Sequence, residues 1–149
     1  LPALLASEND IKSFSLTGQR RDLNREKFDY ENLSSILDNP ESNAKKILKY
    51  LKNAMNVRSN LKQFHPASQM ECLSYGRSDI VVIKRGKGLE SVYTIHNITD
   101  YKINYQLYDQ DLPVTNTNNL SMRDLLTSHK YNCKNIRLEP FQVIWLSYL

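Results

Sequence analysis

The spacing of apolar residues changes near Pro66, and this change divides the chain into two parts. Between Pro40 and Leu61 apolar residues recur at steps of three and four, the period of one face of a helix. They are Ala44, Ile47, Leu48, Leu51, Ala54, Met55 and Leu61. Asn39 suits the capping position, and Pro40 suits the first helical position. The pattern predicts a helix over 40–61.

The first forty residues show weaker patterns. Residues 30–37 place Leu33, Ile36 and Leu37 on one side, which predicts two helical turns. Residues 17–25 are mostly polar, with Gly18 and four charged side chains, so they predict a surface loop.

After Pro66 the chain is rich in β-branched and aromatic residues that alternate with polar ones, as half-buried antiparallel strands do. Turn material separates the segments, for example Gly76-Arg77-Ser78 and the run 85–88. Strands are predicted over 70–75, 79–85, 91–98, 101–108, 135–138 and 141–148. The predicted fold class is α+β: an N-terminal helical segment over 1–66 followed by an antiparallel β-sandwich over 67–149.

Composition narrows the class of protein. Hydrophobic residues make up 40% and charged residues 24% of the 149-residue chain, enough for a real core. The net charge of +4 is small, and Lys45, Lys49 and Lys52 lie on the solvent face of the predicted helix, so nucleic-acid binding is not expected. No apolar run approaches membrane-spanning length, so no membrane is expected as a partner. Residues 1–6 have no basic leader region, and Cys72 and Cys133 lack a pairing motif; both features favour a cytoplasmic protein with reduced thiols. The non-Met, apolar opening suggests a piece of a longer protein.

Few residues form a pattern typical of catalysis. His65, His96 and His129 are far apart and lack ligand spacing, so no metal and no cofactor are predicted. Asp22 and Glu26 stand one helical turn apart, as a pair of catalytic carboxylates would, but the arginines beside them favour salt bridges. Asn97-Ile98-Thr99 is a formal glycosylation sequon, relevant only to a secreted protein.

Two groups of residues are typical of sugar binding. Tyr101, Tyr105 and Tyr108 can serve as stacking platforms, although Tyr is also an ordinary strand residue. Trp145 lies in an almost unbroken apolar run, which predicts a central strand and a core position. Arg20, Arg21 and Arg25 with Asp22 and Asn24 form a dense polar cluster, suited either to sugars and phosphate or to an ion-paired loop.

Several segments together resemble glycoside hydrolase family 13, and within it the sucrose phosphorylase-like subfamily. The segment 4–10 and the run Arg21-Asp22-Leu23-Asn24-Arg25 resemble the end of the family's catalytic barrel. Later segments resemble its C-terminal β-domain in the same order, and the resemblance covers nearly the whole chain. They are Phe64-His65-Pro66, 80–85, Ile95-His96-Asn97-Ile98-Thr99, Arg123-Asp124-Leu125-Leu126 and 138–146.

The resemblance implies that residues 1–66 are the last loop and helices of a (β/α)₈ barrel and residues 67–149 the closing β-sandwich. It places the family's donor-subsite arginine at Arg21, with Asp22, Asn24 and Arg25 completing the substrate-binding motif. Leu23 stands where Ile is usual. The nucleophile and acid/base carboxylates belong to earlier barrel strands, so no catalytic residue is expected in this chain. The whole enzyme would transfer glucosyl groups from α-glucosides to phosphate or water with retention.

Three readings of function remain open from the sequence. The chain is a non-catalytic structural part of such an enzyme, a stand-alone carbohydrate-binding module, or an unrelated interaction protein. In each, the apolar stripe of the 40–61 helix needs a cover: the rest of a barrel, the sandwich, residues 1–39, or a second copy in a homodimer.

Overall fold

The computed structural model describes residues 2–5, 7–23, 27–115, 117 and 120–148. The chain forms two compact units, Leu1–Asn56 and Val57–Leu149, which are taken here one at a time.

The first unit is helical. Its elements are α1 (Pro2–Leu5), α2 (Ile11–Thr17), α3 (Arg20–Leu23), α4 (Tyr30–Asp38) and α5 (Asn43–Ser59), whose last turn enters the second unit. The helix predicted over 30–37 is confirmed by α4. Among the described hydrophobic side chains of this unit only Leu5 and Ala44 are buried. The unit therefore has very little core of its own.

The predicted start of the long helix is wrong by three residues. Asn39 ends α4, where its backbone N–H donates to the Ser35 carbonyl at 3.1 Å. Its side-chain oxygen accepts from the Glu41 N–H at 2.9 Å, which holds Pro40 in a turn. Ser42 caps α5 instead, because its hydroxyl accepts from the Lys45 N–H at 3.1 Å. The stretch over 17–25 also differs from a simple loop, since α3 lies within it.

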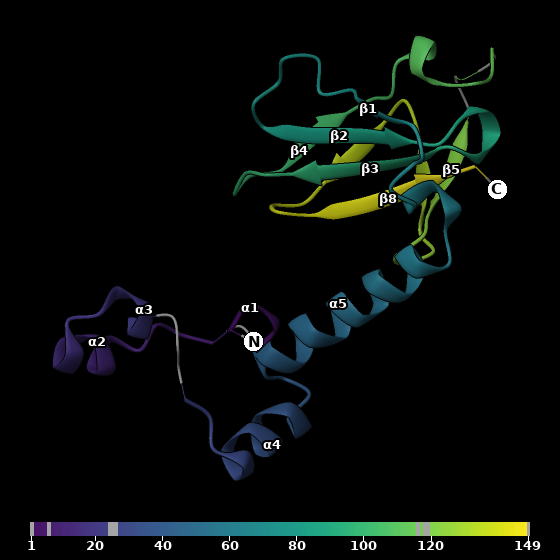
Figure 1. The fold of residues 1–149 in the computed structure, drawn as a ribbon. Coiled ribbons are helices and arrows are strands. Elements are labelled where there is room, and N and C mark those ends of the chain that lie inside the picture. The colour runs from purple at the N-terminus through teal and green to yellow at the C-terminus, as the bar shows by residue number, and fades with distance from the viewer. Residues whose placement is uncertain (1, 6, 24–26, 116, 118–119, 149) are drawn as a thin grey trace. The chain divides into compact units, whose positions relative to one another are not determined.

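The second unit is a β-structure with two sheets (Figure 1). The six-stranded sheet has the order β1-β2-β3-β8-β5-β6, and the two-stranded sheet pairs β4 with β7, all antiparallel. The strands are β1 (Met70–Cys72), β2 (Ile80–Arg85), β3 (Val92–Asn97), β4 (Ile103–Tyr105), β5 (Ser121–Asp124), β6 (Lys130–Asn132), β7 (Ile136–Leu138) and β8 (Val143–Ser147). Three 3₁₀ turns complete it: η1 (Lys62–Phe64), η2 (Gly88–Glu90) and η3 (Asp109–Asp111).

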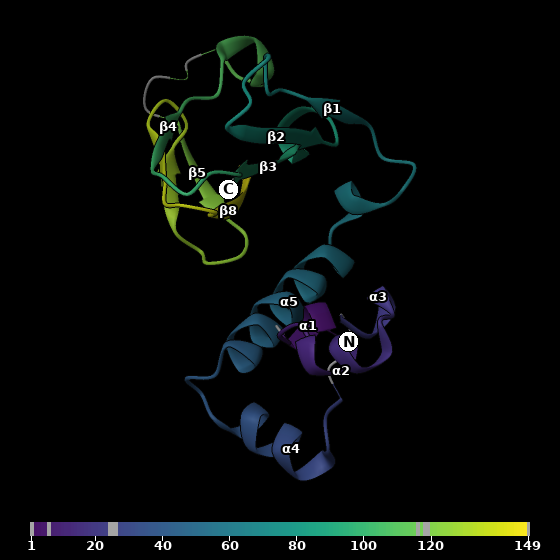
Figure 2. The same ribbon diagram turned by 90° about the vertical axis from the view of Figure 1, so that its left-hand side faces the viewer.

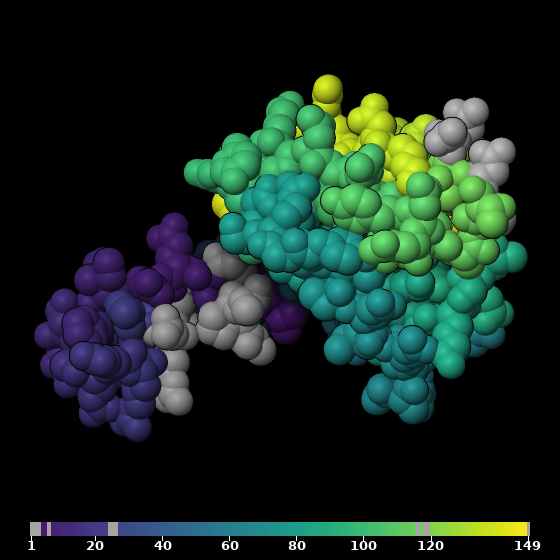
Figure 3. Space-filling model, turned by 90° about the horizontal axis from the view of Figure 1, so that it is seen from above, coloured from purple at the N-terminus to yellow at the C-terminus, as the bar shows by residue number. Residues whose placement is uncertain are grey.

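These two sheets share one core. The space-filling view shows teal, green and yellow segments joined in one body (Figure 3), and the turned ribbon shows the same strands from the side (Figure 2). Buried side chains from both sheets form the core: Leu73, Ile80, Val82, Tyr93, Ile95, Ile103, Tyr105, Leu107, Leu112, Met122, Cys133, Ile136, Leu138, Ile144 and Leu146. The predicted α+β class, with helices before antiparallel strands, is confirmed.

Trp145 lies on the central strand that its apolar surroundings predicted, because β8 pairs with both β3 and β5. Its neighbours Ile144 and Leu146 point into the core, so Trp145 lies on the opposite face of the sheet. There it is half-buried and stacks on the ring of Phe64, with 4.7 Å between the ring centroids. Through this contact with Phe64, Trp145 packs the η1 turn against the sheet.

In the part of the chain that the structure describes, no helix is long and apolar enough to cross a bilayer.

Candidate functional site

The polar segment around Arg21 is built on two short helices. Gly18, in the left-handed conformation, ends α2 and donates its N–H to the Phe14 carbonyl at 2.8 Å. The chain then begins α3 at Arg20, and α2 and α3 pack against each other. Asp10 closes the segment at its base, since its N–H donates to the Leu23 carbonyl at 2.7 Å.

The Asp22 side chain is held by its neighbours in this segment. It accepts a hydrogen bond from the Thr17 hydroxyl at 2.6 Å and stands 4.0 Å from the Arg21 guanidinium. The Arg21 side chain itself is 66% exposed, so its fork is available to a ligand or to another protein surface. Asn24, Arg25 and Glu26 lie outside the described residues. The predicted substrate-binding set Arg21, Asp22, Asn24 and Arg25 thus stays a prediction.

A small pocket of about 170 Å³ adjoins Asp22, lined also by Ser13, Thr17 and Lys27. Asp10 caps α2 beside it by accepting from the backbone N–H and hydroxyl of Ser13, at 2.9 and 2.6 Å. These bonds are the main cause that lowers the pKa of the Asp10 carboxyl, which keeps it ionised. The segment combines fixed carboxylates with exposed cations, the chemistry suited to a hydroxyl-rich or anionic ligand.

A second pocket, of about 300 Å³, lies on the β unit. It is lined by Arg77, Asn104, Tyr105, Gln106, Tyr108, Lys134 and Asn135. Of these the sequence had suggested only the tyrosines. Asn104 occupies an outward position of a predicted alternating strand, and this alternation is the signal that could have found it. Arg77 and Lys134 come from turns, whose placement the local sequence does not specify.

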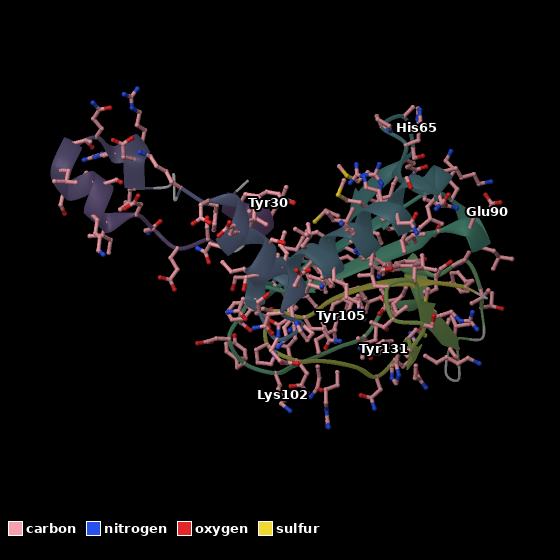
Figure 4. All side chains as sticks on the ribbon, turned by 90° about the horizontal axis from the view of Figure 1, so that it is seen from below. Tyr30, His65, Glu90, Lys102, Tyr105 and Tyr131 are labelled. Atoms are coloured by element: carbon pink, nitrogen blue, oxygen red, sulfur yellow. The ribbon has the colours of Figure 1, made fainter. Side chains whose placement is uncertain are left out.

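The three candidate stacking tyrosines differ in their exposure to solvent. Tyr105 is buried, and its hydroxyl donates to the Leu73 carbonyl at 3.2 Å (Figure 4). Its burial raises the pKa of the phenol, so it stays neutral. Tyr105 is therefore a core residue, and the prediction that it can stack on a sugar is wrong. Tyr101 and Tyr108 remain exposed, at 56% and 41%.

Segments that carry the family resemblance meet in the β unit and bond to one another. The Asn97 amide donates to the carbonyls of Tyr101 and Glu139, at 2.7 and 2.9 Å. Its oxygen accepts from the Thr99 N–H and hydroxyl, at 2.9 and 2.7 Å. Phe141, at a φ of 55°, donates its N–H to the Thr99 carbonyl at 3.0 Å. The loop before β8 is thereby tied to the end of β3.

Asp124 makes a similar connection at the other side of β8. It is fully buried, and one carboxylate oxygen accepts from the N–H groups of Leu126 and Trp145, at 3.2 and 2.8 Å. The other oxygen accepts from the Thr127 hydroxyl at 2.5 Å. The second buried carboxylate, Asp111, accepts from the Tyr75 hydroxyl. Among the described residues, the buried Asp124 is thus held through both of its oxygens and the buried Asp111 through one.

The histidines lie in separate segments, and burial lowers the pKa of His96 on β3. Within the described ranges, no group of three or more His, Cys, Asp or Glu side chains gathers as a metal site would require.

No protein-family model matches the chain. A curated protein, the glucosylglycerate phosphorylase of Allomeiothermus silvanus, is 35% identical over 98 residues, which are 66% of this chain and 17% of that protein. The solved trehalulose synthase MutB of Pseudomonas mesoacidophila superposes with a TM-score of 0.57 at 12% identity, over 77% of this chain and 19% of that one. An Anoxybacillus α-amylase superposes with a TM-score of 0.56 at 18% identity, over 74% of this chain and 24% of that one.

The chain thus spans between 17% and 24% of the length of these relatives. Its fold is one that recurs within such enzymes, and one of them is similar in sequence as well. These findings confirm the resemblance to a C-terminal part of a glycoside hydrolase family 13 protein.

Proposed function

We propose that this chain is the C-terminal part of an enzyme that acts on α-glucosides and that its own role is structural. In the whole enzyme, residues 1–66 would complete the barrel and residues 67–149 would form the closing β-domain of a cytoplasmic protein. The observation that carries the proposal is the junction at β8. Asn97 and the 139–142 loop bond to one another, and Asp124 accepts from the Trp145 N–H on β8; all of these residues lie within the motifs of the resemblance.

Retaining transfer of a glucosyl group requires two carboxyl groups about 5 to 5.5 Å apart. One attacks the anomeric carbon while the other protonates the leaving oxygen, and the second then takes a proton from the phosphate or water that displaces the enzyme. Asp124 is committed to hydrogen bonds of the fold, one oxygen of Asp111 accepts from Tyr75, and Asp22 is held by Thr17. This use of the carboxylates supports a non-catalytic chain within an enzyme whose catalytic carboxylates lie elsewhere.

The segment around Arg21 is proposed to contribute to the donor subsite of that enzyme. Arg21 would hold the glucosyl unit through its guanidinium fork, and Asp22, Asn24 and Arg25 would support it. The exposed Arg21 side chain beside a fixed Asp22 supports this assignment.

A phosphorolysis assay tests the non-catalytic role. The chain is incubated at high concentration with inorganic phosphate and a panel of α-glucosides, and release of glucose 1-phosphate is measured. No product above background is expected. An Asp22→Asn variant serves as the matched control, because it removes the carboxylate nearest to Arg21 and Thr17. Product from the natural chain that is lost in this variant would contradict the proposal.

We also propose that the chain, on its own, forms a homodimer through the helix predicted over 40–61, which is α5. Ile47 and Met55 on this helix are 37% and 65% exposed, and the described part of the first unit buries only two hydrophobic side chains. Exposed apolar area costs about 25 cal/mol per Å², which favours its burial by a second copy.

Sedimentation velocity is expected to give twice the mass of one chain. A Met55→Asp variant should shift the sample to monomer, whereas Lys52→Asp, on the polar side of the helix, should leave the dimer intact. A natural chain that sediments as a monomer at high concentration would contradict dimerisation.

A further inference from the structure

Three side-chain amides are among the residues that line the 300 Å³ pocket on the β unit. Asn104 and Gln106 alternate with the buried residues Ile103, Tyr105 and Leu107, so they face away from the core. Asn135, just before β7, lines the same pocket. Within the described residues none of these three amides has a hydrogen-bond partner for its side chain. Each offers one acceptor and two donors to a ligand.

An exposed aromatic ring stands beside these amides. Tyr108 is 41% exposed and meets the ring of Tyr75 edge-on, with 5.1 Å between the centroids. Tyr75 is anchored in turn, because its hydroxyl donates to the buried Asp111 carboxylate. The contact with the anchored Tyr75 ring thus fixes the orientation of the Tyr108 ring, which leaves the exposed part of this ring available for stacking.

The two cations of the pocket are already neutralised. The Arg77 fork binds both oxygens of Asp79, at 2.8 and 2.5 Å, and this bonding lowers the pKa of that carboxyl. Lys134 donates to Asp109 at 2.5 Å and to the Leu107 carbonyl at 3.0 Å. Because each positive charge has a partner, the pocket has no net attraction for an anion. It is suited to an uncharged ligand with many hydroxyl groups.

We propose that this pocket is a saccharide-binding subsite on the β unit, separate from the segment around Arg21. This inference rests on the proposed function, since it takes the ligand to be an α-glucoside of the kind that the whole enzyme uses. The ring of Tyr108 would stack on the C–H face of a hexose, while the amides of Asn104, Gln106 and Asn135 would exchange hydrogen bonds with its hydroxyls. The volume lies at the lower end of the range for small-molecule sites, which suits a short saccharide.

Several features explain why a sugar fits this site. A hexose has apolar C–H faces and a polar rim, so it needs a flat apolar surface beside groups that both donate and accept. Planar amides supply both kinds of group without a charge. The same features disfavour phosphate, which needs free cations or a row of N–H donors.

Titration of the whole chain with maltose, followed by amide NMR shifts, tests the subsite. We expect saturable binding in the millimolar range, with shifts at residues 104–108 and 134–135. Tyr108→Ala and Asn104→Ala should each weaken binding about tenfold, by loss of stacking and of a hydrogen-bonding group respectively. Tyr101→Ala is the matched control, because this tyrosine is also exposed, at 56% against 41% for Tyr108, but does not line the pocket.

The outcomes separate this inference from the proposed function. Absence of binding, or equal weakening by Tyr101→Ala, would overturn the subsite while leaving the non-catalytic role intact. Binding of inorganic phosphate in place of maltose would also overturn it, because the pocket would then recognise charge. Release of glucose 1-phosphate in the phosphorolysis assay bears only on the proposed function.

Discussion

Replacement of Asn97 by Asp is expected to lower the free energy of unfolding by about 3 kcal/mol. The Asn97 side chain is almost fully buried, and its amide nitrogen donates to the carbonyls of Tyr101 and Glu139. A carboxylate in its place has no proton to donate and would face two carbonyl oxygens away from water. The variant should bury a charge or take up a proton, and both cost free energy.

Urea unfolding followed by far-ultraviolet circular dichroism measures this change. Asn104→Asp is the matched control, since it makes the same substitution on the exposed face of β4, and it should shift stability by less than about 0.5 kcal/mol. Similar losses in the two variants would show that the Asn97 bonds contribute little.

The burial of Asn97 also bears on the sequon Asn97-Ile98-Thr99, because a glycan on the amide nitrogen would displace the two carbonyl partners. In the folded state this sequon is closed to modification.

The sequence predicted the fold class well because the strands of the core have clear signals. β2, β3 and β8 are apolar and β-branched, and each lies within a predicted segment. β5 and β6 were missed because Ser121–Asp124 and Lys130–Asn132 have polar outward residues and few apolar ones. Their pairing comes from the neighbouring strands, which local periodicity does not show.

The candidate sites were predicted less fully, for reasons that particular residues make plain. The motif around Arg21 was found because its residues are consecutive. The pocket on the β unit combines residues from distant segments, so only Tyr108 and the buried Tyr105 drew notice. Tyr105 and Tyr108 are three residues apart, and their opposite burial follows the alternation of buried and exposed positions over 103–108. The position within this alternation, rather than the residue type, determines which tyrosine meets solvent.

Replacement of Asp124 by Ala is expected to cost about 3 kcal/mol of unfolding free energy. The change leaves the N–H groups of Trp145 and Leu126 without their acceptor at a fully buried position. It also frees the Thr127 hydroxyl that holds the turn between β5 and β6. Because β5 joins the sheet through β8, the loss should loosen β5 and the edge strand β6 before the rest of the sheet opens.

Chemical unfolding gives the total loss, and hydrogen exchange shows where it falls. Exchange should accelerate most at residues 121–124 and 130–132, with smaller changes at β2 and β3. Asp124→Asn keeps one acceptor oxygen for Trp145, so it should cost about 1 kcal/mol, whereas the exposed Asp100→Ala should cost less than about 0.5 kcal/mol. If Asp124→Ala lowered the free energy of unfolding as little as Asp100→Ala, the Asp124 carboxylate would not stabilise the fold. The view that the resemblance motifs of this chain maintain its fold would then lose one of its main supports.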